Sequence, residues 1–271
     1  MTETNQVLCS VDEKGIARLI LNRSEKHNAF NAEIIKELTD NLIELKTKPE
    51  VRVLVLQAEG KNFSAGGDLN WMKSMRTASE QENVVDAQKL AALLFELNNF
   101  PRPTIARVQG AAFGGAVGLI SCCDMAVAVE RTKLCLSEVK LGLSPATIGP
   151  YVVAAMGAQQ ARRYMLTAEV FTAVKAQELG MLHEVVTDEA ELDAHVNSWI
   201  NSILGNGPQA LDATKQLIAT IDNSALTSDL VSEDLRQYTS EVIAKLRVSD
   251  EGQEGLSAFF EKRKAAYNKQ D

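Results

Sequence analysis

Two glycine-rich segments, well separated along the chain, constrain its fold and chemistry most strongly. They are 63–69 (FSAGGDL) and 110–118 (GAAFGGAVG), and each follows a strand-like run and precedes a helix-like one. Small residues let a ligand approach the backbone, and a helix N-terminus offers unpaired N–H groups and the positive end of its dipole. One such segment is an ordinary strand-to-helix turn. Two that converge on one oxygen would form an oxyanion hole.

Composition and charge narrow the class of protein. The chain has 271 residues, 45% of them hydrophobic and 24% charged, which suits one large α/β domain or a core with a small appendage. A net charge of −8 argues against a nucleic-acid partner. The first residues show no signal-peptide pattern and no apolar stretch reaches membrane-spanning length, so we expect no membrane association.

Cysteine and histidine usage predicts a reducing compartment and no metal site. The cysteines are Cys9, Cys122, Cys123 and Cys135, without the spacing of a disulfide framework or a zinc site. The adjacent pair lies in an apolar run and is predicted to be core. A cytoplasmic location is therefore expected.

Strand and helix patterns alternate through the first two thirds of the chain. A hairpin is predicted over 6–21, a helix over 31–46, a buried strand over 51–57 and a helix over 79–99. A strand over 104–108, a helix over 116–122 and a strand over 124–129 follow. This alternation predicts an α/β core of parallel strands with crossover helices.

The last part of the chain is predicted to be entirely helical. Helices are expected over 191–203, 209–221, 228–247 and 255–269. We therefore divide the chain into an α/β core, 1–190, and a helical region, 191–271.

The flanks of both glycine-rich segments resemble the enoyl-CoA hydratase/isomerase (crotonase) family. The resemblance extends from 21–30 (LNRSEKHNAF) to 259–264 (FFEKRK). It implies a crotonase (ClpP-like) fold, in which repeated ββα units form a spiral core with an α-helical C-terminal region for trimerisation and active-site covering. It also implies a homotrimer or a dimer of trimers, and coenzyme A that enters as part of an acyl-CoA substrate rather than as a tightly bound cofactor.

The same resemblance assigns roles to individual residues. The N–H groups of Gly67 and Gly115 would hold the thioester oxygen, because hydration or double-bond migration places negative charge there. Family members use two glutamates for hydration; Glu138 stands at the second position, and Gly118 occupies the first. The coenzyme A contacts would fall on Lys26, Ala65, Leu69, Lys262 and Lys264, and the substrate pocket on Met72 and Gly118, where a missing side chain would leave room for a branched acyl group.

Three functions remain open. Segments 66–72, 116–124 and 143–150 resemble bacterial methylglutaconyl-CoA and isohexenylglutaconyl-CoA hydratases of leucine and terpene breakdown, which favours hydration of a branched, carboxylated enoyl-CoA. A single glutamate favours a Δ3,Δ2-enoyl-CoA isomerase. A non-catalytic acyl-CoA-binding protein is the third. Lys73 and Arg76 could pair with a substrate carboxylate or be ordinary exposed cations.

Overall fold

The computed structural model describes residues 5–224 and 232–270. The described chain forms two compact units. One comprises the residues up to Phe100 together with Thr104–Asn197, and the other comprises Pro101–Pro103 and the residues from Ser198 onward.

The chain begins with the predicted hairpin. Strands β1 (Val7–Val11) and β2 (Ile16–Leu21) pair in antiparallel fashion. At the turn, the Asp12 carboxylate accepts hydrogen bonds from the backbone N–H groups of Lys14 and Ile16. This is the local pairing by which aspartate favours turns, so the hairpin prediction is confirmed.

Helix α1 (Ala32–Lys46) confirms the helix predicted over 31–46. Asn31 caps it by accepting a hydrogen bond from the Ile34 N–H at 2.8 Å. Its buried stripe consists of Ile34, Ile35, Leu38, Leu42 and Leu45. Each of these side chains contributes roughly 1.5–3 kcal/mol by leaving water. Ile43, which fits the same periodicity, is half exposed.

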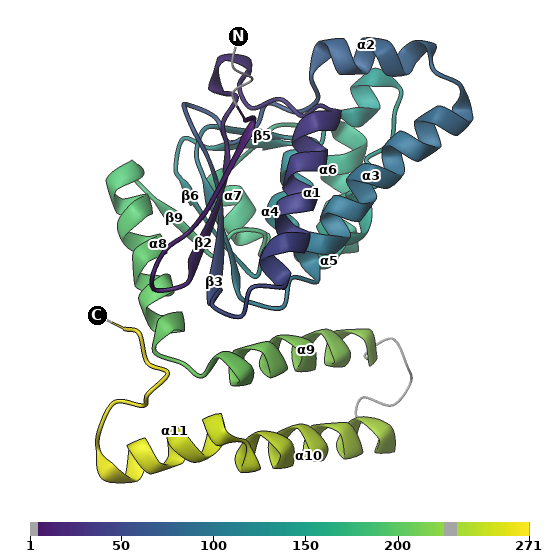
Figure 1. The fold of residues 1–271 in the computed structure, drawn as a ribbon. Helices are drawn as coiled ribbons and strands as arrows, with labels where there is room; N and C mark the ends of the chain where they lie inside the picture. The colour runs from purple at the N-terminus through teal and green to yellow at the C-terminus, as the bar shows by residue number, and fades with distance from the viewer. Residues whose placement is uncertain (1–4, 225–231, 271) are drawn as a thin grey trace. The chain divides into compact units, whose positions relative to one another are not determined.

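The predicted parallel core is a single sheet. In the described part of the chain its order is β1-β2-β3-β4-β6-β9, and every neighbouring pair after β1-β2 is parallel. The added strands are β3 (Val53–Ala58), β4 (Thr104–Val108), β6 (Met125–Val129) and β9 (Glu184–Val186). Helices α1 and α3 (Glu80–Asn98) pack against each other along one face of this sheet (Figure 1).

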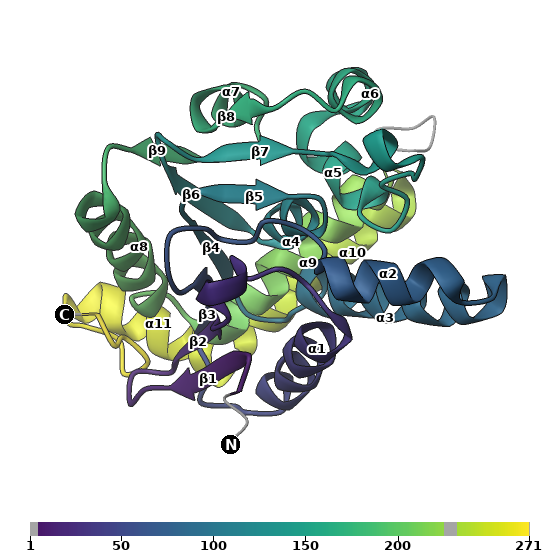
Figure 2. The same cartoon turned by 90° about the horizontal axis from the view of Figure 1, so that it is seen from above.

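A smaller sheet positions the second glycine-rich segment. It joins β5 (Ala111–Phe113), β7 (Lys133–Cys135) and β8 (Phe171–Thr172), seen beside the larger sheet in Figure 2. Strands β5 and β7 are parallel, with Phe113 opposite Cys135. Whatever follows these two strands therefore emerges at the same edge of the sheet.

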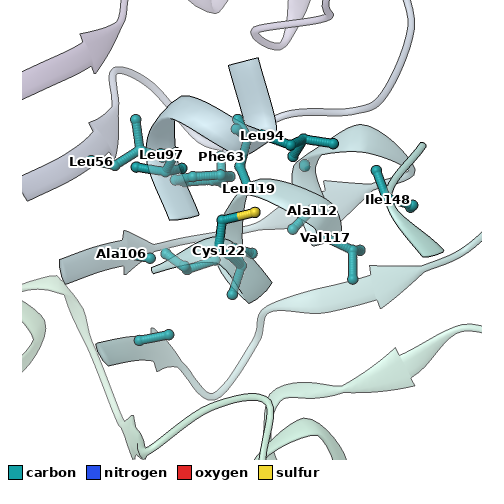
Figure 3. Packing of buried hydrophobic residues seen from close by; sticks show 14 of the residues in the cluster. Leu56, Phe63, Leu94, Leu97, Ala106, Ala112, Val117, Leu119, Cys122 and Ile148 are labelled. Carbon is teal, nitrogen blue, oxygen red and sulfur yellow. The ribbon is translucent and has the colours of Figure 1, made fainter. Parts of the chain in front are cut away.

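Helices fill the space around these sheets. They are α2 (Leu69–Thr77), α4 (Gly115–Cys122), α5 (Gly149–Met156), α6 (Ala158–Thr167), α7 (Ala173–Glu178) and the short 3₁₀ turns Ser24–Lys26 and Glu138–Leu141. Phe63, Leu94, Leu97 and Leu119 gather in one apolar cluster between them (Figure 3). Cys122 is buried in this cluster and Cys123 is partly buried against it, as predicted.

The C-terminal helices confirm the helical prediction with shifted bounds. They are α8 (Glu189–Leu204), α9 (Pro208–Ser224), α10 (Glu233–Val248) and α11 (Asp250–Glu261). The helix expected over 255–269 is wrong at both ends, because α11 begins at Asp250 and Lys262 ends it with a φ of 55°. Residues 228–231 of the helix predicted over 228–247 lie outside the described residues.

No described helix combines the length and apolarity needed to span a bilayer.

Candidate active site

The two glycine-rich segments are joined by backbone hydrogen bonds. The Phe63 N–H donates to the Gln109 carbonyl at 2.7 Å, and the Ser64 N–H donates to the Ala111 carbonyl at 3.0 Å. In return the Phe113 N–H donates to the Ser64 carbonyl at 3.0 Å. These bonds fix the first segment against β5, so the two turns are held next to each other by backbone hydrogen bonds.

The segment 23–30, here called the strap, holds the first turn from the other side. The Ala65 N–H donates to the His27 carbonyl at 3.0 Å, and the Phe30 N–H donates to the Gly66 carbonyl at 2.8 Å. The Asp68 N–H then donates back to the Phe30 carbonyl at 2.7 Å. The turn is therefore held by β5 on one side and by the strap on the other.

Asn28 locks the strap in place. It is fully buried at a φ of 53°, a left-handed conformation that asparagine tolerates better than most residues. Its Oδ1 accepts from the Arg23 N–H at 2.9 Å, while its Nδ2 donates to the carbonyls of Glu59 and Asn62. One side chain thus satisfies three backbone groups.

Asp68 starts helix α2 directly after Gly67. Its carboxylate accepts from the N–H groups of Asn70 and Trp71 and pairs with Arg23 at 2.9 Å. Burial alone raises the pKa of Asp68, but the backbone hydrogen bonds and the Arg23 guanidinium outweigh it and lower that pKa below its ordinary value. Asp68 therefore stays ionised and fixes the start of α2.

Gly67 and Gly115 lie in the two segments that the backbone hydrogen bonds join. Among the described residues, neither N–H has a hydrogen-bond acceptor. The preceding glycines, Gly66 at a φ of 102° and Gly114 at 55°, adopt backbone conformations that disfavour a side chain. Phe30 contacts both segments, since its backbone bridges to Gly67 and its ring lies 3.5 Å from the Cβ position of Gly115. The structure therefore places both predicted donors in segments next to Phe30, and the convergence of their N–H groups on one oxygen stays a prediction.

Glu138 lies beside the second turn because β7 runs parallel to β5. The Gly114 N–H donates to the Cys135 carbonyl at 2.9 Å, and Glu138 Oε1 lies 3.2 Å from the Cβ position of Gly114. The other carboxylate oxygen, Oε2, is buried without a hydrogen-bond partner. This desolvation raises the pKa of Glu138 above its ordinary value. A raised pKa suits a carboxyl group that must both take and give a proton.

A cavity of about 440 Å³ lies between the elements that carry Gly67 and Glu138. Apolar side chains form most of its wall: Trp71, Met72, Met75, Leu141 and Leu143. Its polar members are Arg76, Asn83 and Asp86. Met72 also packs on the donor turn, with its sulfur 3.2 Å from the Cβ position of Gly67.

Gly118 does not provide the space that the sequence suggested. A carbon at its Cβ position would lie 2.4 Å from Ile148 Cγ2 and 3.3 Å from Leu94 Cδ2. Both neighbours belong to the apolar cluster in Figure 3. The expectation of open room at this position is therefore wrong: Ile148 fills it, and an apolar wall stands where family members carry a glutamate.

The predicted coenzyme A residues fall in both compact units. Lys26, Ala65 and Leu69 are exposed around the strap and the first turn, where the Ala65 N–H is bonded to His27, next to Lys26. Lys262 and Lys264 are exposed after α11, in the second unit. Contact of these five residues with coenzyme A stays a prediction.

Several residues that build the site were not assigned from sequence. Asp68 carries a recognisable signal, because an aspartate before a helix-like run is a common N-cap. Phe30, Asn28 and Arg23 act through residues distant in sequence, so no local pattern could have identified them. Leu141 and Leu143 line the cavity only because the turn after Glu138 directs them there.

Comparison with known proteins decides the family. The model of the family described as enoyl-CoA hydratase/isomerase matches residues 12–270. The chain belongs to this enoyl-CoA hydratase/isomerase family. A crystal structure of an enoyl-CoA hydratase from Shewanella pealeana is 47% identical, with a TM-score of 0.91, covering 97% of this chain and 96% of that one.

Further relatives agree. A structure of a putative enoyl CoA hydratase/isomerase (crotonase) from Legionella pneumophila is 42% identical with a TM-score of 0.90, covering 97% of this chain and 99% of that one. A putative enoyl-CoA hydratase from Thermus thermophilus is 31% identical over 93% of this chain and 97% of its own length. The predicted crotonase fold, an α/β core followed by C-terminal helices, is thus confirmed.

The contact between Gly118 and Ile148 gives a stability prediction. Alanine for glycine inside a helix normally gains up to about 1 kcal/mol. Here we expect Gly118→Ala to destabilise the protein by about 1–3 kcal/mol, because the added methyl overpacks against Ile148. Chemical denaturation of a double-mutant cycle with Ile148→Ala checks this, and the alanine should cost less once Ile148 is shortened. Simple stabilisation by Gly118→Ala would show that open space exists there.

The buried carboxylate gives a pH prediction. Because folding raises the pKa of Glu138, its protonated form favours the folded state. This contribution is complete below the unfolded pKa of about 4.5 and is lost as pH rises through the folded pKa. Glu138→Gln should therefore gain stability relative to the wild type as pH increases from acid to neutral. Denaturant titrations across this range measure the difference; exposed Glu13→Gln is the matched control and should show no such trend.

Proposed function

We propose that this protein is an enoyl-CoA hydratase in which Glu138 transfers the proton. The observation that carries the proposal is the buried, unpartnered Glu138 Oε2 beside the turn that presents the Gly115 N–H. Placing a carboxylate there without a partner costs stability, and a group held at such a cost is a candidate for proton transfer.

The proposed reaction needs one carboxylate and two amides. Glu138 accepts a proton from water while the water oxygen bonds to the β-carbon. The electrons of the double bond move toward the thioester oxygen, where the Gly67 and Gly115 N–H groups stabilise the negative charge. Glu138 then returns the proton to the α-carbon, so the atoms of water are added and the carboxylate is regenerated.

A second candidate is a Δ3,Δ2-enoyl-CoA isomerase. The apolar wall that Ile148 forms at Gly118 favours it, because a second glutamate is absent from that position. One carboxylate can remove a proton from C2 and return it to C4. Binding of acyl-CoA without turnover is the outcome expected of a non-catalytic member.

For the acyl group, we propose a branched glutaconyl-type chain, such as methylglutaconyl or isohexenylglutaconyl. The support is the cavity lined by α2, α3 and the turn after Glu138, whose wall is mainly apolar but includes Arg76. Arg76 has no ion-pair partner among the described residues, so it is available to a substrate carboxylate.

The remaining assignments are also proposals. Coenzyme A would enter only as part of the substrate, contacting Lys26, Ala65, Leu69, Lys262 and Lys264. A cytoplasmic homotrimer or dimer of trimers is the assembly that we propose, with the C-terminal helices contributing to its contacts.

Glu138→Gln tests the assignment of the proton-transfer group. We expect turnover to fall about 100-fold to 10,000-fold, because the amide keeps the shape but exchanges no proton. Affinity for an acyl-CoA, measured by calorimetry, should stay nearly unchanged. Product analysis of the wild type separates the reactions: 2-enoyl-CoA to 3-hydroxyacyl-CoA supports hydration, and 3-enoyl-CoA to 2-enoyl-CoA supports isomerisation. A loss below tenfold on the best substrate would remove Glu138 from this role.

Arg76→Met tests the proposed acyl group. Loss of a charged hydrogen bond should lower kcat/KM about tenfold for a carboxylated, branched enoyl-CoA. An uncharged branched analogue should be unaffected. Asp86→Asn should instead raise kcat/KM for the carboxylated substrate, because Asp86 lines the same cavity and its negative charge repels a substrate carboxylate. Lys73→Met is the control, because Lys73 is exposed on the same helix but does not line the cavity. Equal effects of Arg76→Met on both substrates would refute a carboxylate-binding role.

A further inference from the structure

One buried residue, Phe30, is next to both of the segments that carry the candidate donors. Phe30 is 3% exposed. Its backbone bonds to the residues on either side of Gly67, at 2.8 Å to the Gly66 carbonyl and 2.7 Å from the Asp68 N–H. The Cδ2 and Cε2 atoms of its ring lie 3.5 and 3.6 Å from the Cβ position of Gly115.

The backbone bonds of Phe30 determine where the Gly67 N–H points. The Gly66 carbonyl and the Gly67 N–H belong to one planar peptide and face opposite directions. When the Phe30 N–H binds the Gly66 carbonyl, the Gly67 N–H must therefore point away from the strap. The Asp68 bond to the Phe30 carbonyl fixes the following peptide in the same way.

The ring of Phe30 limits how the second donor can move. The Gly114 carbonyl, in the same peptide as the Gly115 N–H, accepts from the Val117 N–H at 2.9 Å, so this peptide is part of the first turn of α4. The ring borders the space beside Gly115, since a carbon at the Cβ position of Gly115 would lie at ordinary van der Waals distance from it. A shorter side chain would leave a void into which the start of α4 can relax.

We propose that Phe30 is a positioning residue that sets the geometry of the two donors relative to each other. Its backbone orients the Gly67 N–H, and its ring sets the approach of the Gly115 N–H. The inference rests on the proposed function in one respect, namely that both amides bind the thioester oxygen. Donors preorganised in this way stabilise developing charge without rearranging during the reaction.

Side-chain variants separate the ring from the backbone bonds. Phe30→Leu and Phe30→Ala keep both backbone hydrogen bonds and remove contact with Gly115. Because a displacement of about 1 Å costs roughly 100-fold, we expect kcat to fall about 10-fold to 100-fold. KM should change less than kcat, since the proposed coenzyme A residues Lys26, Ala65 and Leu69 are exposed whereas the Phe30 ring is buried. If the alanine variant does not fold, the leucine variant decides the test.

The C=O stretching band of a bound, 13C-labelled acyl-CoA gives a direct readout. In the wild type it should lie below the band of the free thioester, and in the Phe30 variants it should shift back toward that band. Phe100→Leu is the matched control. Phe100 is a fully buried phenyl residue between α3 and β4, at the end of β4 opposite the glycine-rich segment. The Phe100→Leu variant should have a lower melting temperature but an unchanged kcat and an unchanged C=O stretching band.

The outcomes distinguish the two proposals. Suppose that the C=O band of the bound thioester in the wild type equals that of the free thioester, and that a folded Gly67→Pro variant keeps full activity. The two N–H groups then do not stabilise the thioester oxygen, and the proposed function is overturned. A shifted wild-type band that stays unchanged in Phe30→Leu, with kcat retained and only the melting temperature lowered, leaves the function standing. That second result overturns the positioning role, because Phe30 would then behave like Phe100.

Discussion

The backbone pairing between the two glycine-rich turns is the constraint on which the candidate site depends. Ser64 exchanges hydrogen bonds with Ala111 and Phe113, so the loop after β3 is joined to β5 although the two are distant in sequence. Backbone bonds of this kind do not depend on side-chain rotamers. The glycines act after the paired residues: Gly66 and Gly114 adopt the positive φ values of the turns, and Gly67 and Gly115 carry no side chain beside their N–H groups.

Glu138 depends on the same arrangement. Parallel pairing of β5 with β7 makes both strands end at one edge, and the 3₁₀ turn that follows β7 starts at Glu138. The carboxylate reaches Gly114 because nothing larger than glycine stands there. A side chain at Gly114 would both strain the backbone, at its φ of 55°, and displace the carboxylate. The position of Glu138, the proposed acid–base group, is thus a consequence of strand register.

Much of this organisation could be predicted from the sequence, because its signals are local. Periodicity identified α1, β3, α3 and β4 to within a few residues, and the motifs identified both turns and the family. Packing could not be predicted in the same way. The absence of a side chain at Gly118 suggested open space, but the atom that fills it comes from Ile148, thirty residues later on another helix boundary. The end of α11 at Glu261 was missed because Lys262 adopts a left-handed φ without the glycine that usually signals it.

Charge movement under the proposed reaction explains why a buried carboxylate and two amides belong in one site. In the proposed reaction Glu138 begins as the charged base, and its buried Oε2 has no hydrogen-bond donor among the described residues. When Glu138 accepts the proton, that charge moves to the thioester oxygen, where two fixed N–H groups face it. Desolvation raises the energy of the starting charge, and the preorganised donors lower the energy of the developing one. If Glu138 were solvated, desolvation would no longer raise the energy of the starting charge. If Gly67 or Gly115 were displaced, the donors would no longer stabilise the developing charge. Both contributions therefore depend on the same small region, where β5, β7 and the strap hold backbone and carboxylate in place.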